Sequence, residues 1–231
     1  MRYSWAISQS VEIARSVLGE ERALQSRCRY GGRRCRFAPV GRHARRRYLG
    51  EQMIRLRRAA RHRASWSGGR RLGNAPDVAV RPMAQEDFDS LYEMYREVIA
   101  DGGGTPAGSG VPSREVFEDG WIRNRAVFVA WSGLDRLGSY FVRANFPAFA
   151  GHIAQGGYIV AKKARGRGVG SLLIADSLRA AKDLGFTAMM FNLVFESNPS
   201  RRLYEAAGFE VVGRIPEARD GEPGLIYWRR L

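Results

Sequence analysis

Two arginines and three glycines are concentrated in residues 164–170, which read ARGRGVG. The run follows YIVAKK and precedes SLLIADSLRAAKDLG, whose apolar residues have the spacing of an amphipathic helix. A helix N-terminus presents unpaired N–H groups and a partial positive charge, and glycines allow an anion to approach the backbone closely. The run therefore predicts a turn that binds phosphate or pyrophosphate.

Two well-known phosphate motifs fit this turn poorly. A P-loop requires Gly-Lys-Ser/Thr at the helix entrance, and Gly170-Ser171 has no lysine. A dinucleotide fingerprint requires G-x-G-x-x-G after the first strand of a βαβ unit, whereas the spacing here is G-x-G-x-G and the preceding strands look antiparallel. Coenzyme A, which also carries a pyrophosphate, is the third ligand to consider.

The elements around the turn can be predicted from apolar spacing and turn residues. Asn198 and Pro199 are expected at the N-cap and first position of a short helix that Gly208 ends. A row of antiparallel strands followed by one glycine-rich strand-to-helix turn predicts an α+β fold. The expected strands are residues 78–81, 125–131, 137–143, 157–161, 186–195, 209–215 and 224–231, and the expected helices are residues 84–100, 113–121, 169–184 and 200–207. Residues 101–113 are expected to form a loop that is long enough to cover a substrate.

Arg165-x-x-Gly168-x-Gly170 resembles the R/Q-x-x-G-x-G/A signature of the GNAT superfamily of N-acetyltransferases. The order of elements from this turn to Ala207-Gly208-Phe209 is similar to the CoA-binding half of that superfamily. Three further stretches, NFPAFAGHIAQGGYIV, FNLVFESN and VVGRIPEA, resemble fungal azetidine-2-carboxylate N-acetyltransferases and their bacterial relatives. The resemblance covers residues 78–231 and implies a mixed, mostly antiparallel GNAT sheet with a splayed strand pair, flanking helices and acetyl-CoA as co-substrate.

The resemblance also implies how CoA would be held. The splayed strands would be Gly157 to Lys163 and Thr187 to Val194, and pantetheine would bond along the first as an added strand. A backbone N–H near Ile159 or Val160 would polarise the thioester oxygen. The remaining implied CoA contacts are Arg165, Gly166, Arg167, Gly168, Val169, Gly170, Ser171, Asn198 and Tyr204.

Tyr204 and two asparagines are candidates for the chemistry and for acceptor binding. A phenol can give a proton to the leaving thiolate, although Tyr204 could equally be an aromatic packed on a buried helix face. Asn192 lies in an apolar strand and needs a hydrogen-bond partner, because an unpaired buried amide costs about 1–3 kcal/mol. The resemblance implies that Asn145 and Asn192 contact the carboxylate and amine of the acceptor. A structural hydrogen bond is the alternative.

The general base has two candidates, Glu196 and then His152, the only histidine in residues 77–231. A small amino-acid-like amine is the expected acceptor, and transfer is expected to be direct. Both cysteines, Cys28 and Cys35, lie in the N-terminal third, so neither a cysteine nucleophile nor a cysteine-ligated metal is expected in the body.

The formal charge of +15 comes entirely from residues 1–76, which hold 19 arginines, no lysine and four glutamates. Such like charges favour an extended, solvated chain, so we expect a disordered extension before a domain at residues 77–231. The extension could bind nucleic acid, guide the enzyme to a ribosomal or nucleoid protein, act as a transit peptide, or be a non-functional product of an upstream start codon. If the extension guides the enzyme to a ribosomal or nucleoid protein, that protein would be the acceptor. If the extension binds nucleic acid, the CoA-binding fold could act as a sensor.

No apolar run approaches the roughly 18 residues of a membrane-spanning helix, so a cytoplasmic protein without a membrane partner is expected. A homodimer is left open.

Overall fold

The computed structural model describes residues 29–30, 33–34, 78–101, 112–123 and 125–231. The chain divides into two compact units, residues 1–57 and 58–231. In the first unit, the described residues form an antiparallel pair, β1 (Arg29–Tyr30) and β2 (Arg33–Arg34). The expected boundary between residues 76 and 77, and residues 102–111 of the expected loop, lie outside the described residues.

A seven-stranded sheet with the order β3-β4-β5-β6-β7-β9-β8 forms the second unit. Neighbouring strands are antiparallel except β6 and β7, which are parallel. This mixed sheet with flanking helices confirms the expected α+β GNAT fold. The strands are β3 (Ala79–Pro82), β4 (Ala126–Ser132), β5 (Asp135–Ala144), β6 (Ile153–Val160), β7 (Ala188–Phe195), β8 (Glu210–Arg219) and β9 (Glu222–Arg230).

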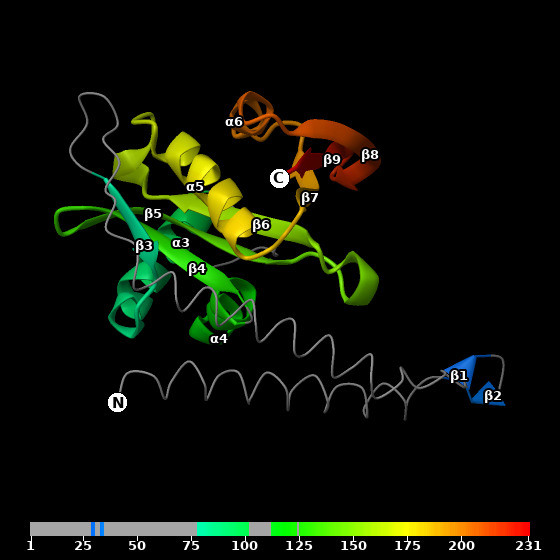
Figure 1. Ribbon diagram of the computed structural model, residues 1–231, viewed down its shortest axis with the longest axis horizontal. Coiled ribbons are helices and arrows are strands. Elements are labelled where there is room, and N and C mark those ends of the chain that lie inside the picture. The colour runs from blue at the N-terminus through cyan, green and yellow to red at the C-terminus, as the bar shows by residue number, and fades with distance from the viewer. Residues whose placement is uncertain (1–28, 31–32, 35–77, 102–111, 124) are drawn as a thin grey trace. The chain divides into compact units, whose positions relative to one another are not determined.

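Helices cover both faces of the sheet, and the alternation of β5 side chains shows which face each one covers. The Tyr140 hydroxyl bonds Asp176 of α5, whereas the adjacent Phe141 ring packs edge-on against Trp121. Figure 1 shows α5 across one face, with α3 and α4 beyond the other side of β4 and β5. The helices are α3 (Phe88–Ala100) after the 3-10 turn η1 (Gln85–Asp87), α4 (Arg114–Phe117) continued by the π-helical turn η2 (Glu118–Ile122), α5 (Val169–Asp183) and α6 (Arg201–Ala206).

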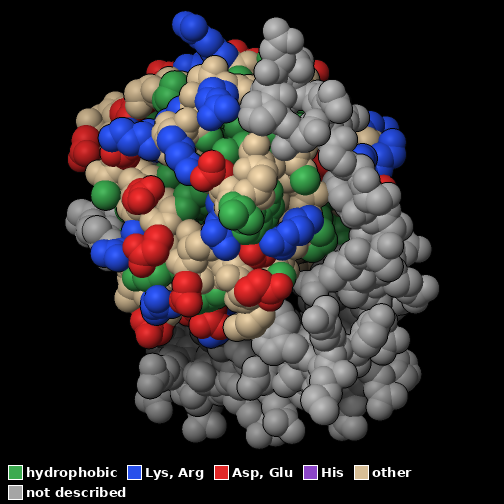
Figure 2. All heavy atoms as spheres, turned by 90° about the vertical axis from the view of Figure 1, so that its left-hand side faces the viewer, with side chains coloured by type: hydrophobic (Ala, Val, Ile, Leu, Met, Phe, Trp, Pro, Cys, Tyr) green, Lys and Arg blue, Asp and Glu red, His purple; other side chains and the backbone are tan. Residues whose placement is uncertain are grey.

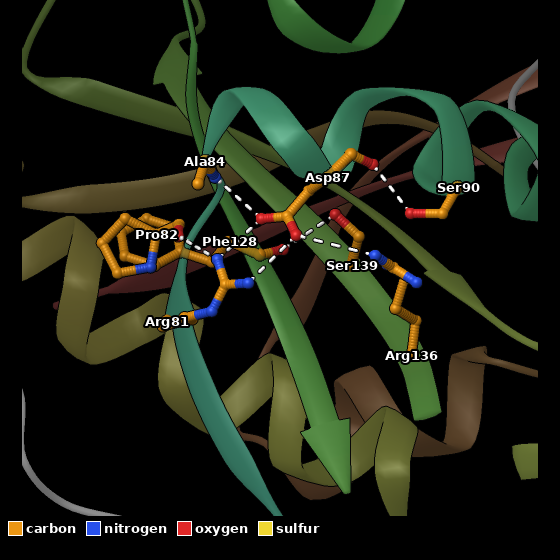
Figure 3. A network of polar contacts seen from close by, with 8 residues as sticks. All are labelled: Arg81, Pro82, Ala84, Asp87, Ser90, Phe128, Arg136 and Ser139. Atoms are coloured by element: carbon orange, nitrogen blue, oxygen red, sulfur yellow. Dashed lines mark hydrogen bonds and ion pairs between the residues drawn. The ribbon is translucent and has the colours of Figure 1, made fainter. Parts of the chain in front are cut away.

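A buried carboxylate ties the edge strand β3 to the start of α3 (Figure 3). The Asp87 side chain is 1% exposed and accepts two hydrogen bonds from Arg81, at 2.6 and 3.0 Å. It also accepts a bond from the Ala84 N–H at 2.8 Å, and Arg136 lies 4.0 Å away. Because each Asp87 oxygen has a charged or N–H partner, the buried charge is compensated.

The predicted and observed bounds differ at several elements, and the differences at β6 and at the start of α6 bear on the site. β6 begins at Ile153 and ends at Val160, because Lys162–Ala164 turn into a 3-10 helix, so the expected strand to Lys163 is too long. Asn198 is not the N-cap of α6, which begins at Arg201 after Ser200. The Asn198 Oδ1 instead accepts a bond from the Ser200 N–H at 2.9 Å, an Asx turn that leads into the helix.

The surface of the second unit mixes both charge signs. Figure 2 shows Lys and Arg interspersed with Asp and Glu over the face in view. Within the described residues, no helix combines the length and apolar character needed to cross a membrane.

Candidate acetyl-CoA and acceptor site

Strands β6 and β7 separate soon after they meet. Their parallel pairing joins Ile153 to Ala188 and Ala154 to Met189, whereas the strands continue to Val160 and Phe195. β6 remains paired with β5 along this length, up to Val160 with Gly138. The edge of β6 that faces β7 is thus left without strand pairing, which is the expected splayed pair.

Backbone alternation decides which N–H groups point toward this opening. The Ala161 N–H donates to Leu137 of the β5 side, and the Ile153 carbonyl accepts from Asn145 on the same side. Since alternate residues of an antiparallel strand bond the same neighbour, Ile159 also points toward β5. Of the two expected thioester donors, only Val160 therefore faces the opening. Tyr158, which sequence reasoning missed as a backbone donor, faces it too.

The glycine-rich turn joins the end of β6 to α5. Gly166 and Gly168 have φ of 72° and 80°, left-handed values that favour glycine, and no atom lies within 4 Å of an added Cβ at either position. Gly168 occupies the N-cap of α5 and its carbonyl accepts the first helical bond from Leu172. The N–H groups of Val169, Gly170 and Ser171 therefore precede the helical hydrogen bonding and form the anion-binding end of the helix.

Gly170 is small for a different reason. A Cβ on Gly170 would lie 3.0 Å from Cδ1 of Leu203, so this glycine allows α5 and α6 to pack closely. At the other end of the turn, Arg165 bonds the Asp101 carboxylate at 3.2 Å, and Lys162 bonds the second oxygen of the same carboxylate at 3.2 Å. Asp101 is the residue that follows α3, so a carboxylate from another element holds two cations of the turn.

Asn145 and Asn192 come together. Each side-chain amide donates to the other's oxygen at 2.7 Å. Asn192 lies where the register of β7 against β9 shifts between Phe191 and Val194, and this bulge lets it face Asn145 beyond the end of β5. The partner required by the sequence is therefore Asn145, and each amide keeps one N–H and one lone pair for another ligand.

Tyr204 belongs to an aromatic cluster that lines both separating strands. Its ring centroid lies 6.2 Å from Tyr158 of β6 and 4.7 Å from Phe191 of β7. Burial raises the pKa of Tyr204 to about 12, and a hydrogen bond with Ser200 opposes this shift. Burial also raises the pKa of Tyr158, whose hydroxyl contacts Ser177 at 2.7 Å. The Tyr204 phenol is thus both packed and protonated, and it can donate a hydrogen bond.

The two candidate bases lie at opposite ends of the central strands. Glu196 follows β7, and because β6 and β7 are parallel, it lies at the same end of the strands as the glycine turn that follows β6. Its carboxylate accepts a bond from Arg214 at 3.2 Å. His152 precedes β6 and is exposed, with Nδ1 3.0 Å from the Phe149 carbonyl oxygen. About eight residues of strand, or roughly 25 Å, separate His152 from Val160.

Arg125 and Arg143 are polar residues of this region that the sequence analysis did not select. They lie at the open end of the hairpin formed by β4 and β5. Pairing the predicted strands 125–131 and 137–143 as a hairpin would have placed these two arginines next to each other. The part of the chain that the structure describes has no group of three or more His, Cys, Asp or Glu side chains able to hold a metal ion.

This geometry is accompanied by a family relationship. The profile of the acetyltransferase (GNAT) family matches residues 90–209, so the chain belongs to this family. N-acetyltransferase aca1 of Schizosaccharomyces pombe is 37% identical over 83 residues, which are 36% of this chain and 40% of aca1. The chain thus covers less than half the length of that relative.

Two further relatives cover more of the chain. YwnH of Bacillus subtilis, named as a candidate phosphinothricin acetyltransferase, is 27% identical over 146 residues, which are 60% of this chain and 88% of YwnH. The structure of a GCN5-related N-acetyltransferase from Kribbella flavida superposes with a TM-score of 0.62 and 29% identity, over 67% of this chain and 98% of that protein.

Proposed function

We propose that the protein transfers the acetyl group of acetyl-CoA directly to the amine of a small amino-acid-like acceptor. The observation that carries this proposal is the separation of β6 from β7 beside the glycine turn. An extended pantetheine chain can pair with the free edge of β6 as an added strand. Its pyrophosphate then lies at the N–H groups of Val169, Gly170 and Ser171, with Arg165 and Arg167 beside it and Asn198 next to α6.

In this arrangement the backbone of β6 stabilises the reaction. An N–H of Tyr158 or Val160 donates to the thioester oxygen as negative charge develops on it, an effect worth about 100- to 1000-fold in rate for one donor. The thiolate of CoA leaves as the amine nitrogen bonds the acetyl carbon. Tyr204, protonated and next to both strands, donates a hydrogen bond to that thiolate.

The amine must lose a proton before or during the attack. Glu196 is the better placed of the two candidate bases, because it lies at the end of the strands where the glycine turn begins, whereas His152 lies at the opposite end of β6. Nε of Arg214 donates to Oε1 of Glu196 at 3.2 Å and so helps to orient this carboxylate. We propose that Glu196 acts through an intervening water.

The acceptor class is inferred from the asparagine pair and from the relatives. Asn145 and Asn192 keep free amide groups that can bond a small polar molecule. The name of YwnH points to phosphinothricin, an amino acid, and the resemblance to fungal azetidine-2-carboxylate acetyltransferases points to another. Amino acids and proline analogues are therefore the first compounds to try.

Turnover of acetyl-CoA by the full chain tests this proposal, with thiol release measured against a panel of amines that includes azetidine-2-carboxylate. We expect release that depends on both substrates and an acetylated amine by mass spectrometry. A Gly168→Val variant should raise the KM for acetyl-CoA more than that for the amine. Absence of acetyl-CoA binding in calorimetry would show that the proposal is wrong.

A protein acceptor is the second candidate, because the whole excess positive charge lies in residues 1–76. In this case the extension would guide the enzyme to an acidic surface or to a nucleoprotein. A chain of residues 77–231 would then acetylate free amines as the full chain does, but would lose activity on ribosomes in a salt-dependent manner. Equal activity of both chains on ribosomes would exclude a guiding role.

A further inference from the structure

Arg125 and Arg143 lie opposite each other at the end of the β4–β5 hairpin. The pairing of β4 with β5 ends at Ala126 and Val142, so Arg125, just before β4, lies beside Arg143, just after Val142, and β6 continues the row with Gln155 opposite Arg143. Phe141 and Arg143 are alternate residues of β5 and share a face, and the Arg125 guanidinium lies over the Phe141 ring, which places both arginines on this face. Both arginines are partly buried.

Neutral oxygen atoms are the partners of these two guanidinium groups. Nη1 of Arg125 donates to the carbonyl oxygens of Asp119, at 2.6 Å, and Arg123. Nε and Nη2 of Arg143 both donate to Oε1 of Gln155, the former at 2.7 Å. The nearby Asp119 carboxylate pairs with Arg123 at 2.7 Å instead. Among the described residues, no carboxylate forms an ion pair with Arg125 or Arg143.

The proximity of the Arg125 and Arg143 guanidinium groups is electrostatically unfavourable. Burial and the neighbouring Arg143 lower the pKa of Arg125 to about 10, and burial lowers the pKa of Arg143. The Nε of Arg125 is buried and has no hydrogen-bond partner in the described part of the chain, while its guanidinium lies 5.0 Å from the Phe141 ring centroid. Like charges opposite each other destabilise a sheet, so an anion bound between them would relieve a cost already present.

The arginine row leads to the separating strands. Asn145 lies two residues beyond Arg143, and so on the same face of the sheet, where it bonds Asn192. Gln155 lies three residues before Tyr158, or about 10 Å along β6. An acceptor held in this row by a carboxylate would therefore lie nearer, along β6, to the N–H of Tyr158 than to the N–H of Val160.

We propose that Arg125 and Arg143 form the subsite for a carboxylate of the acceptor. The proposal rests on the acetyltransferase function above and defines its substrate class as amines that bear a carboxylate. Guanidinium groups bind carboxylates in a bidentate manner, and two of them match its two oxygens. Oε1 of Gln155 accepts from Arg143 at the position that a carboxylate oxygen of the acceptor would take. Asn145 and Asn192 then contact the amine end.

Matched acceptors and matched variants test the subsite. Each amino acid of the panel is compared with its carboxamide, which keeps the amine and loses the charge. We expect the wild type to favour the amino acid at least tenfold in kcat/KM. Arg143→Gln and Arg125→Gln should each raise the KM for the amino acid at least tenfold, with little change in kcat, in the KM for acetyl-CoA or in turnover of the carboxamide.

Controls separate a subsite from a structural role. Arg96→Gln removes another partly buried arginine, one paired with Glu93, and should leave the KM for the amino acid unchanged. Arg143→Lys keeps the charge and should recover part of the loss. Because the opposed charges repel, Arg143→Gln should not lower the unfolding temperature without ligand.

Two different failures can be told apart. If the protein turns over acetyl-CoA but uses amino acids and carboxamides equally, or if Arg143→Gln affects both equally, the subsite is wrong and the enzyme function stands. If acetyl-CoA does not bind and no amine is acetylated, the function itself is wrong.

Discussion

Asn145 and Asn192 exchange two hydrogen bonds of 2.7 Å, although 47 residues separate them in the sequence. Asn145 follows β5 and Asn192 lies in β7, so the pair links these strands past β6, which lies between them in the sheet. Asn145 lies next to Ile153, where β6 and β7 are still paired, whereas Asn192 lies three residues beyond Met189, where β7 has left β6. The pair therefore spans the start of the opening.

A double-mutant cycle measures this link. Asn145→Ala or Asn192→Ala leaves a partly buried amide without its partner, so each should lower the free energy of unfolding by about 1–2 kcal/mol. The double variant should lose about 1 kcal/mol less than the sum of the two, because both single changes remove the same bonds. Urea unfolding gives these values, and additive losses would show that the two amides are not coupled.

Asp101 forms ion pairs with Lys162 and Arg165, so we expect it to compete with CoA for these two cations. Asp101→Asn releases Arg165 and Lys162 from an exposed ion pair, so the variant should bind acetyl-CoA a few times more tightly at low salt. The gain should shrink as salt screens the charges. Calorimetry at two salt concentrations measures the gain in acetyl-CoA affinity. Asp89→Asn is the control, because it makes the same change in charge but removes the partner of Arg114 instead. Weaker binding by Asp101→Asn would contradict this role.

The glycines of the turn should differ in their response to alanine. Gly168→Ala forces a left-handed residue with a side chain at the N-cap, which should cost about 1–2 kcal/mol and raise the KM for acetyl-CoA. Gly170→Ala meets only the end of the Leu203 side chain, so its stability should change little. Urea unfolding and steady-state kinetics test both variants. Equal losses at both positions would argue against a conformational role for Gly168.

Tyr204 should make the protein sensitive to alkali. In the folded state burial raises its pKa from 10.0 to about 12, so between these values the folded state holds a proton that the unfolded state has lost. The contribution of the protonated Tyr204 phenol to the free energy of unfolding is complete below pH 10 and is lost as the pH rises toward 12. Urea midpoints from pH 8 to 11 should therefore fall less steeply in Tyr204→Phe than in the wild type.

The same variant tests the chemistry. Loss of the hydrogen bond to the leaving thiolate should lower kcat for acetyl transfer at least tenfold, with the KM for acetyl-CoA little changed. An unchanged kcat would leave Tyr204 as a packing residue of the aromatic cluster.

Local signals in the sequence determined the order of the elements and the glycine turn. The spacing of apolar residues predicted α5, and Gly185, with φ of 85°, follows the C-cap of that helix, where a left-handed glycine is common. Gly166 and Gly168 have the left-handed conformations that such a turn needs. These features depend on residues a few positions apart, so a sequence can specify them by itself.

The tertiary structure decided which groups face the site. The direction of the Ile159 and Val160 N–H groups depends on the register of β6 against β5, and the partner of Asn192 depends on a bulge in β7. The opposition of Arg125 and Arg143 depends on the register of a hairpin. Register is set by packing between segments far apart in the chain, and a shift of one residue would turn each of these groups to the other side.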